Sequence, residues 1–412
     1  MKRPTVSQTA RLRILMVVPY DLSEPGGGVK HHALGLARVL RDQGDTVVVA
    51  GPTSQPIREP NLVGFRGVAN VQSNGSANRI GIFVNPWTIW RFLRRHPFDV
   101  IHVHDPLVPA LPYWMAWLSK RIPKVCTFHA FSERPTLGMR LGHRLAAPTI
   151  LPRYRRGMAV SLPAQHFVRE VWRRPLSIVP NGVHTDVFTP GPDFGLARRV
   201  DPGHPLRLFF CARLSDERKG FADLLRAYTL LRERRIPVTL DVAGEAAGPL
   251  PPDLPGLTYH GPVSLPTLVE RFQSCDVLVA PSTGQESFGI ILLEAMASGR
   301  AIVCSDIEGY RQVVDSQGAY LCQRSSPESL VAAIADLVDN PERRRLMAIA
   351  NRNRSLQFDW TRLTAHVRSQ YLLALDNQPE AALHVATARA TTPALTAATA
   401  VGAASAYEAT AQ

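Results

Sequence analysis

Short apolar runs alternate with amphipathic stretches from the start of the chain. The run RILMVV (13–18) ends at Pro19, and VKHHALGLARVLRDQG (29–44) carries apolar residues at helical spacing. The apolar run TVVVA (46–50) follows directly. Strand, helix and strand in this order form a βαβ unit, which predicts a parallel sheet covered on both faces.

The same alternation continues in two successive series. The first series adds apolar strands at 100–104, 124–128 and 157–161. The second series has strands at 206–212, 239–244, 276–281 and 301–306, and helices at 221–234, 265–275, 288–299 and 328–338. The predicted fold class is therefore α/β, with two doubly wound domains.

The length of 412 residues allows each domain a core of its own. From residue 377 the sequence is rich in Ala and Thr with almost no large apolar residue, which is typical of a disordered tail. The expected division is an N-terminal extension 1–12, a first domain 13–184, a second domain 185–355, a terminal helix 356–376 and a tail 377–412.

Composition excludes several classes of protein. With 45% hydrophobic and 20% charged residues, the chain is neither collagen-like nor wholly disordered. Its five cysteines lie far apart, and neither Cys nor His residues show ligand spacing, so we expect no metal site and a reducing compartment. No apolar run reaches the roughly 18–20 residues of a membrane span. The N-terminus does not read as a signal peptide, so a cytoplasmic protein is expected.

The net charge of +13 comes entirely from the first half of the chain. Residues 1–184 hold 25 Lys and Arg against 9 Asp and Glu, whereas residues 185–412 hold 22 against 25. This asymmetry indicates an anionic partner, which could be a nucleic acid, a lipid surface or a phosphorylated substrate. A merely basic surface is the alternative.

One basic segment, NPWTIWRFLRRHP (85–97), predicts an amphipathic helix. Arg91, Arg94 and Arg95 share one arc with Trp87 at its edge. The apolar residues spread over the opposite side: Ile89, Trp90, Phe92 and Leu93. Such a helix suits an anionic membrane surface. The alternative is a core-facing helix with a solvated basic face, and the two readings are compatible.

Three segments at strand ends suggest a site for a phosphorylated ligand. In PGGGV (25–29), Gly27 and Gly28 allow close backbone approach at a helix N-terminus, although the G-x-G-x-x-G spacing of nicotinamide or flavin sites is missing. In ARLSDERKG (212–220), Arg213 and Lys219 could clamp a diphosphate. In GQESFGIILLEAMASG (284–299), a loop glutamate and a helical glutamate could accept hydrogen bonds from sugar and ribose hydroxyls. A tight turn and a solvated basic loop are the alternatives for the first two segments.

Histidines end two strands of the first domain, in HVHDP (102–106) and TFHAFSERP (127–135). We place His129, beside Arg134, in the cleft, where it could hydrogen-bond a sugar hydroxyl or act as a general acid or base. For His102 and His104 we prefer a buried structural role.

In this order, the PGG-V turn, TFH, PNGV (180–183), R-x5-K-G and E-x7-E resemble the family 4 retaining glycosyltransferases. The resemblance covers roughly residues 13–376, and ESFGIILLEAMASG is its most specific part. It implies the GT-B fold, in which two Rossmann-like domains face a central cleft. The opening VVPYD…PGGGVKHH is similar to that of phosphatidyl-myo-inositol mannosyltransferases, which move mannose from GDP-mannose to phosphatidylinositol on the inner face of the plasma membrane.

The resemblance implies a role for each matching residue. Catalysis would involve His129, Arg213, Lys219 and Glu286. The nucleotide sugar would be bound by Gly27, Gly28, Arg213, Lys219, Glu286, Phe288, Gly289 and Glu294. The acceptor side would include Tyr20, Lys30 and Arg134, and the membrane side Trp87, Arg91, Arg94 and Arg95. No tightly bound cofactor or metal is implied, and a divalent cation at the diphosphate is left unassigned.

Several departures from the family pattern affect the acceptor and the donor base. The opening loop has one residue more than usual, Lys30 replaces an uncharged polar residue, and His184 stands where Asp is frequent. A UDP-sugar-dependent transferase with another acceptor therefore stays open, as does a sugar-nucleotide epimerase on the same fold. No nucleic-acid-binding motif is present, so nucleic acid is not an expected partner.

Overall fold

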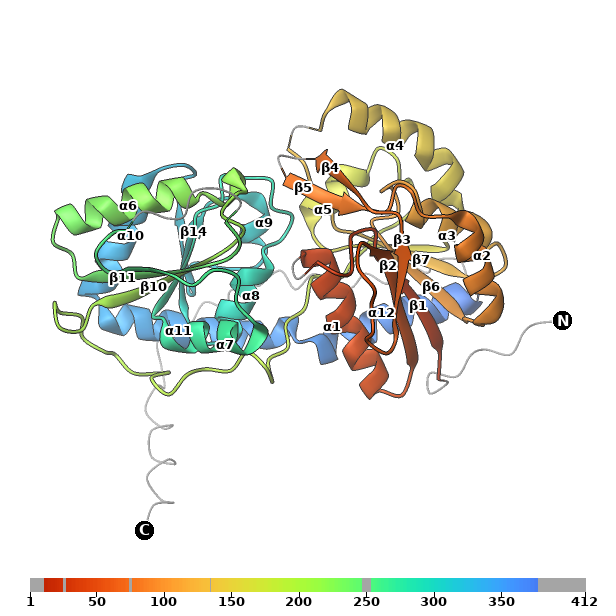
Figure 1. Cartoon of the computed structure of the whole chain (residues 1–412). Helices are drawn as coiled ribbons and strands as arrows, with labels where there is room; N and C mark the ends of the chain where they lie inside the picture. The colour runs from red at the N-terminus through yellow and green to blue at the C-terminus, as the bar shows by residue number, and fades with distance from the viewer. Residues whose placement is uncertain (1–10, 25–26, 74–75, 134, 247–252, 377–412) are drawn as a thin grey trace, which may run out of the picture. The chain divides into compact units, whose positions relative to one another are not determined.

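The computed structural model describes residues 11–24, 27–73, 76–133, 135–246 and 253–376. Most of the expected N-terminal extension and the whole tail 377–412 lie outside these residues, as do Pro25, Gly26 and Arg134. Figure 1 shows two α/β domains, each built on its own sheet. This confirms the predicted fold class.

The first sheet is parallel throughout, in the order β3-β2-β1-β6-β7-β8-β9. Its strands are β1 (Arg13–Val17), β2 (Thr46–Thr53), β3 (Leu62–Arg66), β6 (Val100–His104), β7 (Lys124–Phe128), β8 (Arg156–Ala159) and β9 (Ser177–Ile178). A separate antiparallel hairpin is formed by β4 (Ala69–Ser73) and β5 (Ser76–Ile80). The helices of this domain are α1 (Gly28–Asp42), α2 (Pro86–Arg95), α3 (Leu111–Leu118), α4 (Leu137–Ile150) and α5 (Leu162–Val168).

The second sheet is also parallel, in the order β12-β11-β10-β13-β14-β15. Its strands are β10 (Leu206–Cys211), β11 (Val238–Ala243), β12 (Leu257–Tyr259), β13 (Val277–Ala280), β14 (Ala301–Ser305) and β15 (Ala319–Cys322). Its helices are α6 (Phe221–Glu233), α7 (Leu265–Ser274), α8 (Ile290–Ala297), α9 (Glu308–Arg311), α10 (Pro327–Asp339) and α11 (Pro341–Ser355). The last strand of the first sheet ends at Ile178 and β10 begins at Leu206, so the segment 179–205 connects the two sheets.

Strand β1 shows how one apolar run serves two cores. Side chains alternate between the faces of a strand. Ile14 and Met16 therefore pack with α1 on one face of the sheet, and Leu15 and Val17 pack in the cluster on the other face. All four side chains are fully buried, which is why the run reads as continuous rather than alternating.

The last described helix, α12 (Trp360–Asp376), returns to the first domain. Figure 1 shows it beside α1 and the first sheet, and its residues Leu363, Val367 and Tyr371 belong to the same core cluster as α1. The sequence predicts one helix over 356–376, but the structure has a short 3-10 turn at Leu356–Phe358 and begins the α-helix at Trp360. The extended backbone of Asp359 separates the two.

The Trp360 side chain packs α12 into the first domain, against two glycines. A Cβ atom on Gly35 of α1 would lie 2.5 Å from the Trp360 ring, and a Cβ on Gly182 of the PNGV segment would lie 2.4 Å from it. Both distances are far inside van der Waals contact, so the ring occupies the space that two side chains would need. The backbone of the PNGV segment is joined to the same point, because Trp360 N–H donates to Val183 O.

We predict that Gly182→Ala and Trp360→Ala each destabilise the protein, but that their effects are not additive. Removing the buried indole costs about 3–5 kcal/mol of unfolding free energy. The added methyl of Gly182→Ala clashes with the ring, so it becomes nearly harmless once the ring is gone. Denaturant unfolding of the two single variants and the double variant measures this coupling. Additive losses would mean that the ring does not occupy the space beside Gly182.

Candidate active site

A pocket of about 330 Å³ brings together the ends of several elements from both domains. The first domain contributes Gly28 and Val29 at the start of α1, His129 after β7, and Asn181. The second domain contributes the end of β10 with Arg213 and Lys219, and the loop 286–291 that leads into α8. The pocket therefore lies at the carboxyl ends of parallel strands, where open α/β sheets bind ligands.

Two helix N-termini open onto this pocket. Gly27 adopts φ 118° ahead of α1, and Gly289 adopts φ 101° ahead of α8. At Gly289 a Cβ would also lie 2.6 Å from the Tyr310 ring, so only glycine fits the turn. The first N–H groups of a helix have no partner within the helix and carry partial positive charge. Together the two termini favour an anion such as a phosphate in the pocket.

The expected cation pair lies at the same pocket. Gly220 has φ 70°, and a Cβ there would come within 2.0 Å of Pro281 O, so glycine is required for the turn that presents Lys219. The Lys219 ammonium donates to Glu286 Oε1, which holds it in place without a ligand. Arg213 lies 4.0 Å from the buried Asp216 carboxylate. Although burial alone would raise the pKa of Asp216, the Arg218 guanidinium 2.6 Å away lowers it.

Glu294 lies one turn into α8, as the sequence predicts, and is not among the residues that line the pocket. It neighbours the pocket-lining Cys211, whose pKa rises through burial and the nearby Glu294 carboxylate. Burial raises the pKa of Glu294 itself from 4.5 to about 8. At neutral pH this carboxyl group keeps its proton until a charged or polar ligand compensates the burial.

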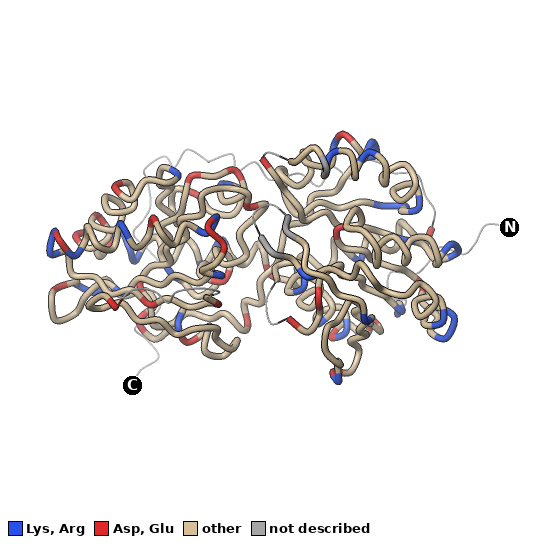
Figure 2. The backbone as a smooth tube through the Cα atoms, turned by 45° about the horizontal axis from the view of Figure 1, so that its top comes forward, with Lys and Arg blue, Asp and Glu red and all other residues tan. Residues whose placement is uncertain are grey.

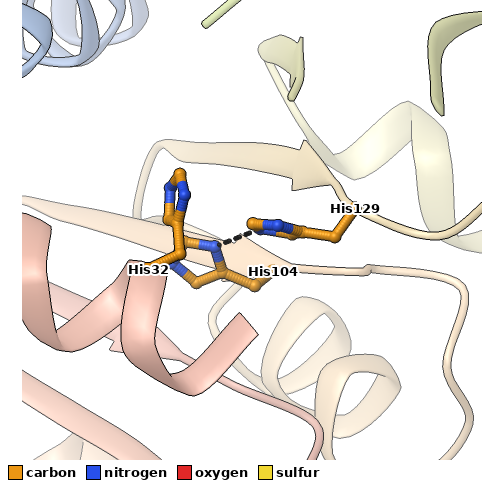
Figure 3. Close-up of side chains that lie close together, drawn as sticks. All are labelled: His32, His104 and His129. Carbon is orange, nitrogen blue, oxygen red and sulfur yellow. Dashed lines mark hydrogen bonds between the residues drawn. The ribbon is translucent and has the colours of Figure 1, made fainter. Parts of the chain in front are cut away.

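Buried histidines lie on the first-domain side of the pocket, and Figure 3 shows His32, His104 and His129 together. One ring nitrogen from each of His32, His104 and His129 lies within 4.8 Å of the other two. His32 Nδ1 is 2.7 Å from Asn181 Oδ1, and His104 Nδ1 is 3.0 Å from His129 Nε2. Burial lowers the pKa of His32 to about 4 and the pKa of His104 and His129 well below 6.5, so all three rings are neutral.

Sequence patterns did not predict this cluster, because its members come from α1, the end of β6 and the loop after β7. No carboxylate belongs to it, and two of its nitrogens already bond to each other. In that bond one nitrogen donates its N–H and the other accepts with its lone pair, so the donating nitrogen cannot ligate a metal ion in this tautomer. We therefore interpret the cluster as a hydrogen-bonded group.

The expectation of a buried position holds for both His102 and His104. His102 is fully buried, with Nδ1 2.8 Å from Tyr371 Oη on α12 and Nε2 2.7 Å from Thr127 Oγ1. Both of its nitrogens are thus used within the core. His104 is equally buried but bonds directly to His129, which lines the pocket.

Asp105 fixes the backbone that carries His129. Its Oδ1 accepts the N–H groups of His129 and Ala130 at 2.7 and 3.2 Å, from a residue with φ 46°. Burial raises the pKa of Asp105 to about 6. Burial and this neighbouring carboxylate also raise the pKa of Tyr20, which the sequence places on the acceptor side. Sequence reasoning missed Asp105, His32 and Asn181, although all three lie in motifs it singled out.

The structure therefore brings seven predicted residues into one pocket: Gly28, His129, Arg213, Lys219, Glu286, Phe288 and Gly289. Gly27, Tyr20, Lys30 and Glu294 lie outside its lining, and Arg134 falls outside the described residues. Lys30 Nζ donates to the carbonyl oxygens of Leu22 at 2.7 Å and of Glu24 at 2.5 Å, so it braces the loop ahead of α1.

Two parallel-sheet domains with a pocket at the strand ends match the GT-B fold. Among solved structures, sucrose-phosphate synthase from Thermosynechococcus elongatus is similar at a TM-score of 0.66, with 16% identity and coverage of 89% of this chain and all of that one. HepE from Anabaena, in complex with UDP and glucose, is similar at 0.68, with 16% identity and coverage of 87% and 99%.

Sequence comparisons give the family. Residues 26–187 match the model of glycosyltransferase family 4, and residues 205–340 match that of the glycosyl transferases group 1. The phosphatidyl-myo-inositol mannosyltransferase of Mycolicibacterium smegmatis is 32% identical over 380 residues, which cover 87% of this chain and 93% of that protein. The D-inositol 3-phosphate glycosyltransferase of an Arthrobacter strain is 32% identical over 217 residues, which cover 49% and 51%. The chain belongs to the family 4 glycosyltransferases and is a hexosyltransferase.

We predict that the raised pKa of Glu294 makes the folded protein lose stability as pH rises. The unfolded chain releases this proton near pH 4.5 and the folded chain near pH 8, so between these values the folded state binds more protons and its advantage falls with pH. Glu294→Gln cannot ionise, so it should gain stability relative to the parent protein from pH 5 to pH 8.5. Thermal unfolding of both proteins at the two pH values measures this, and an unchanged difference would contradict the raised pKa.

Proposed function

We propose that this protein transfers mannose from GDP-mannose, with retention of anomeric configuration, to a phosphatidylinositol-type lipid at the cytoplasmic face of the plasma membrane. The observation that carries the proposal is the pocket in which two helix N-termini, Arg213 and Lys219 face one another. A relative named for phosphatidyl-myo-inositol mannosyl transfer aligns over 87% of the chain and supports the donor sugar and the acceptor.

In this proposal the leaving group is the nucleoside diphosphate. Arg213 and Lys219 would stabilise the charge that develops on it, together with the N–H groups at the start of α1 and α8. Binding would exchange the Lys219–Glu286 ion pair for contacts with the ligand, which frees the Glu286 carboxylate for a sugar hydroxyl. Glu294 would accept from the ribose hydroxyls. The donor domain is thus 185–355, and the first domain 13–184 faces the acceptor.

Three neighbouring helices of the first domain support attachment to a lipid surface. Each exposes large apolar side chains: Trp87 and Trp90 on α2, Trp114 and Trp117 on α3, and Leu137, Leu141 and Leu145 on α4. Helix α3 contacts both α2 and α4. Large exposed apolar groups on neighbouring elements mark interaction sites, and Trp with Arg is typical of membrane interfaces.

The arginines of α2 lie against these rings. The Arg91 guanidinium is 5.5 Å from the centre of the Trp87 ring, and that of Arg94 is 5.2 Å from the Trp90 ring. The expectation that Trp90 packs away from the arginines is wrong: its side chain is 41% exposed, and only Ile89 of this helix is buried. Figure 2 shows Lys and Arg predominating on the N-terminal domain, whereas the two signs mix on the other.

No helix in the described part of the chain has the length and apolar character needed to cross a bilayer. Attachment in this proposal is therefore peripheral, through the basic and aromatic surface of α2, α3 and α4. A UDP-sugar donor stays as the second candidate, because HepE, which is similar in fold, is described with UDP and glucose.

The direct test is donor consumption. We expect release of GDP from GDP-mannose that depends on phosphatidylinositol vesicles, and little release from UDP-glucose or without acceptor. Lys219→Met should lower kcat about 10²–10³-fold, because it removes one cation from the leaving group. Arg226→Met removes an exposed cation of α6 in the same domain and should leave turnover unchanged. Lipid-independent release, or release from UDP-glucose alone, would overturn the substrate assignment.

The membrane surface has a separate test. Changing Arg91, Arg94 and Arg95 together to Ser should weaken binding to anionic phospholipid vesicles by about tenfold or more at low salt. The matched control changes Arg226, Arg232 and Arg234 on and beside α6, which are also exposed, and removes the same charge from the other domain. Vesicle co-sedimentation compares the two variants. Equally weakened vesicle binding in both variants would mean that binding depends on the net charge of the protein and not on the surface of α2.

A further inference from the structure

The bond between His104 and His129 leaves one unresolved choice, namely which ring donates the shared hydrogen. His104 Nδ1 and His129 Nε2 are 3.0 Å apart (Figure 3). Both rings are neutral and buried, so each carries a single N–H, on one of its two nitrogens. The donor of this bond therefore fixes the tautomer of both rings.

The other nitrogen of His104 decides between the two arrangements. His104 Nε2 is buried and has no hydrogen-bond partner among the described residues. If His129 donated, His104 would have to carry its hydrogen on Nε2, which would leave an N–H group buried without an acceptor. If His104 donates from Nδ1, only a lone pair is left without a partner. A buried N–H without an acceptor is rarer, and costs more free energy, than a buried lone pair without a donor. Donation from His104 Nδ1 is therefore favoured.

The choice of donor also determines which nitrogen of His129 carries the hydrogen. With Nε2 accepting from His104, the hydrogen of His129 must sit on Nδ1. This ring lines the pocket, and Nδ1 makes no hydrogen bond within the described part of the chain. We propose that His104 is a positioning residue that fixes the tautomer of His129, so that His129 presents an N–H donor to the pocket and acts as neither base nor acid.

The neighbouring contacts hold this arrangement from two sides. Asp105 ties the backbone of His129 through its N–H group, 2.7 Å from Oδ1. The ring of His102 lies against that of His104 at 4.2 Å between centres, and its own nitrogens are occupied by Tyr371 and Thr127. The His32 ring meets that of His129 edge-on at 4.6 Å. Among the described residues, no carboxylate hydrogen-bonds to either nitrogen of the His104–His129 bond; the Asp105 carboxylate contacts the backbone of His129, not its ring nitrogens.

An N–H donor selects the oxygen that it can bind. It suits a hydroxyl or phosphate oxygen of the nucleotide sugar and cannot take a proton from an incoming acceptor hydroxyl. That His129 meets a nucleotide sugar rests on the proposed function. The tautomer does not, because it follows from contacts within the protein.

The first test reads the tautomer in the free protein. In protein labelled with ¹⁵N-histidine, the nitrogen shifts and one-bond couplings of His129 should show a hydrogen on Nδ1 and none on Nε2, and the signals are assigned by their loss in His129→Asn. This pattern should persist from pH 5.5 to pH 8, since burial keeps the ring neutral. A hydrogen on Nε2 would overturn the proposal, whatever the substrate proves to be.

The second test changes the donor. His104→Asn keeps an N–H near the position of Nδ1, so it should keep the His129 tautomer and most of the activity. His104→Leu removes the donor, so the tautomers should mix and kcat should fall about tenfold, the effect of one neutral hydrogen bond. His102→Asn is the matched control, a buried histidine on the same strand with no bond to His129, and should alter thermal stability but not the His129 signals. An unchanged His129 tautomer in folded His104→Leu would overturn the positioning role.

Discussion

The architecture depends on the packing of one indole ring. Trp360 occupies space that glycines leave free on α1 and on the PNGV segment, and it contacts the His32 ring at 4.8 Å. Because His32 is in turn hydrogen-bonded to the pocket-lining Asn181, the Trp360 ring is linked to the pocket through His32. The same core that seats α12 therefore also sets the orientation of side chains behind the active site. This connects the PNGV motif to stability as well as to the site.

The ionisable groups around the pocket are paired with one another or neutral. The cation that would meet a diphosphate is paired with Glu286, the Asp216 carboxylate holds Arg218 beside it, and Glu294 carries its own proton. None of these groups is left as an isolated buried charge, which would be costly. An anionic ligand can take the place of Glu286 beside Lys219, so this pairing can change on binding without the fold being strained beforehand.

Sequence patterns predicted what depends on neighbours along the chain. The central strands of both sheets, the first helix and the loop glycine at 289 follow from local runs and spacing. The short strands β9 and β12 carry too few residues to show a pattern, and α11 has no clear apolar face, so these were not predicted. For the site, the motif residues were found, but the bond between His104 and His129 was not. That bond arises from two parallel strands ending side by side, a relation that spacing along one chain does not contain.

The return of α12 to the first domain also bears on how the protein is made. On the ribosome the first sheet is complete long before α12, which covers its α1 face, whereas β10 to α11 form a continuous stretch that can fold as it emerges. The first domain must therefore wait, with part of an apolar face uncovered, until the last described helix has been synthesised. The second domain, although later in sequence, can therefore finish folding first. We expect chaperones to bind mainly the first domain, which is synthesised first but completed last.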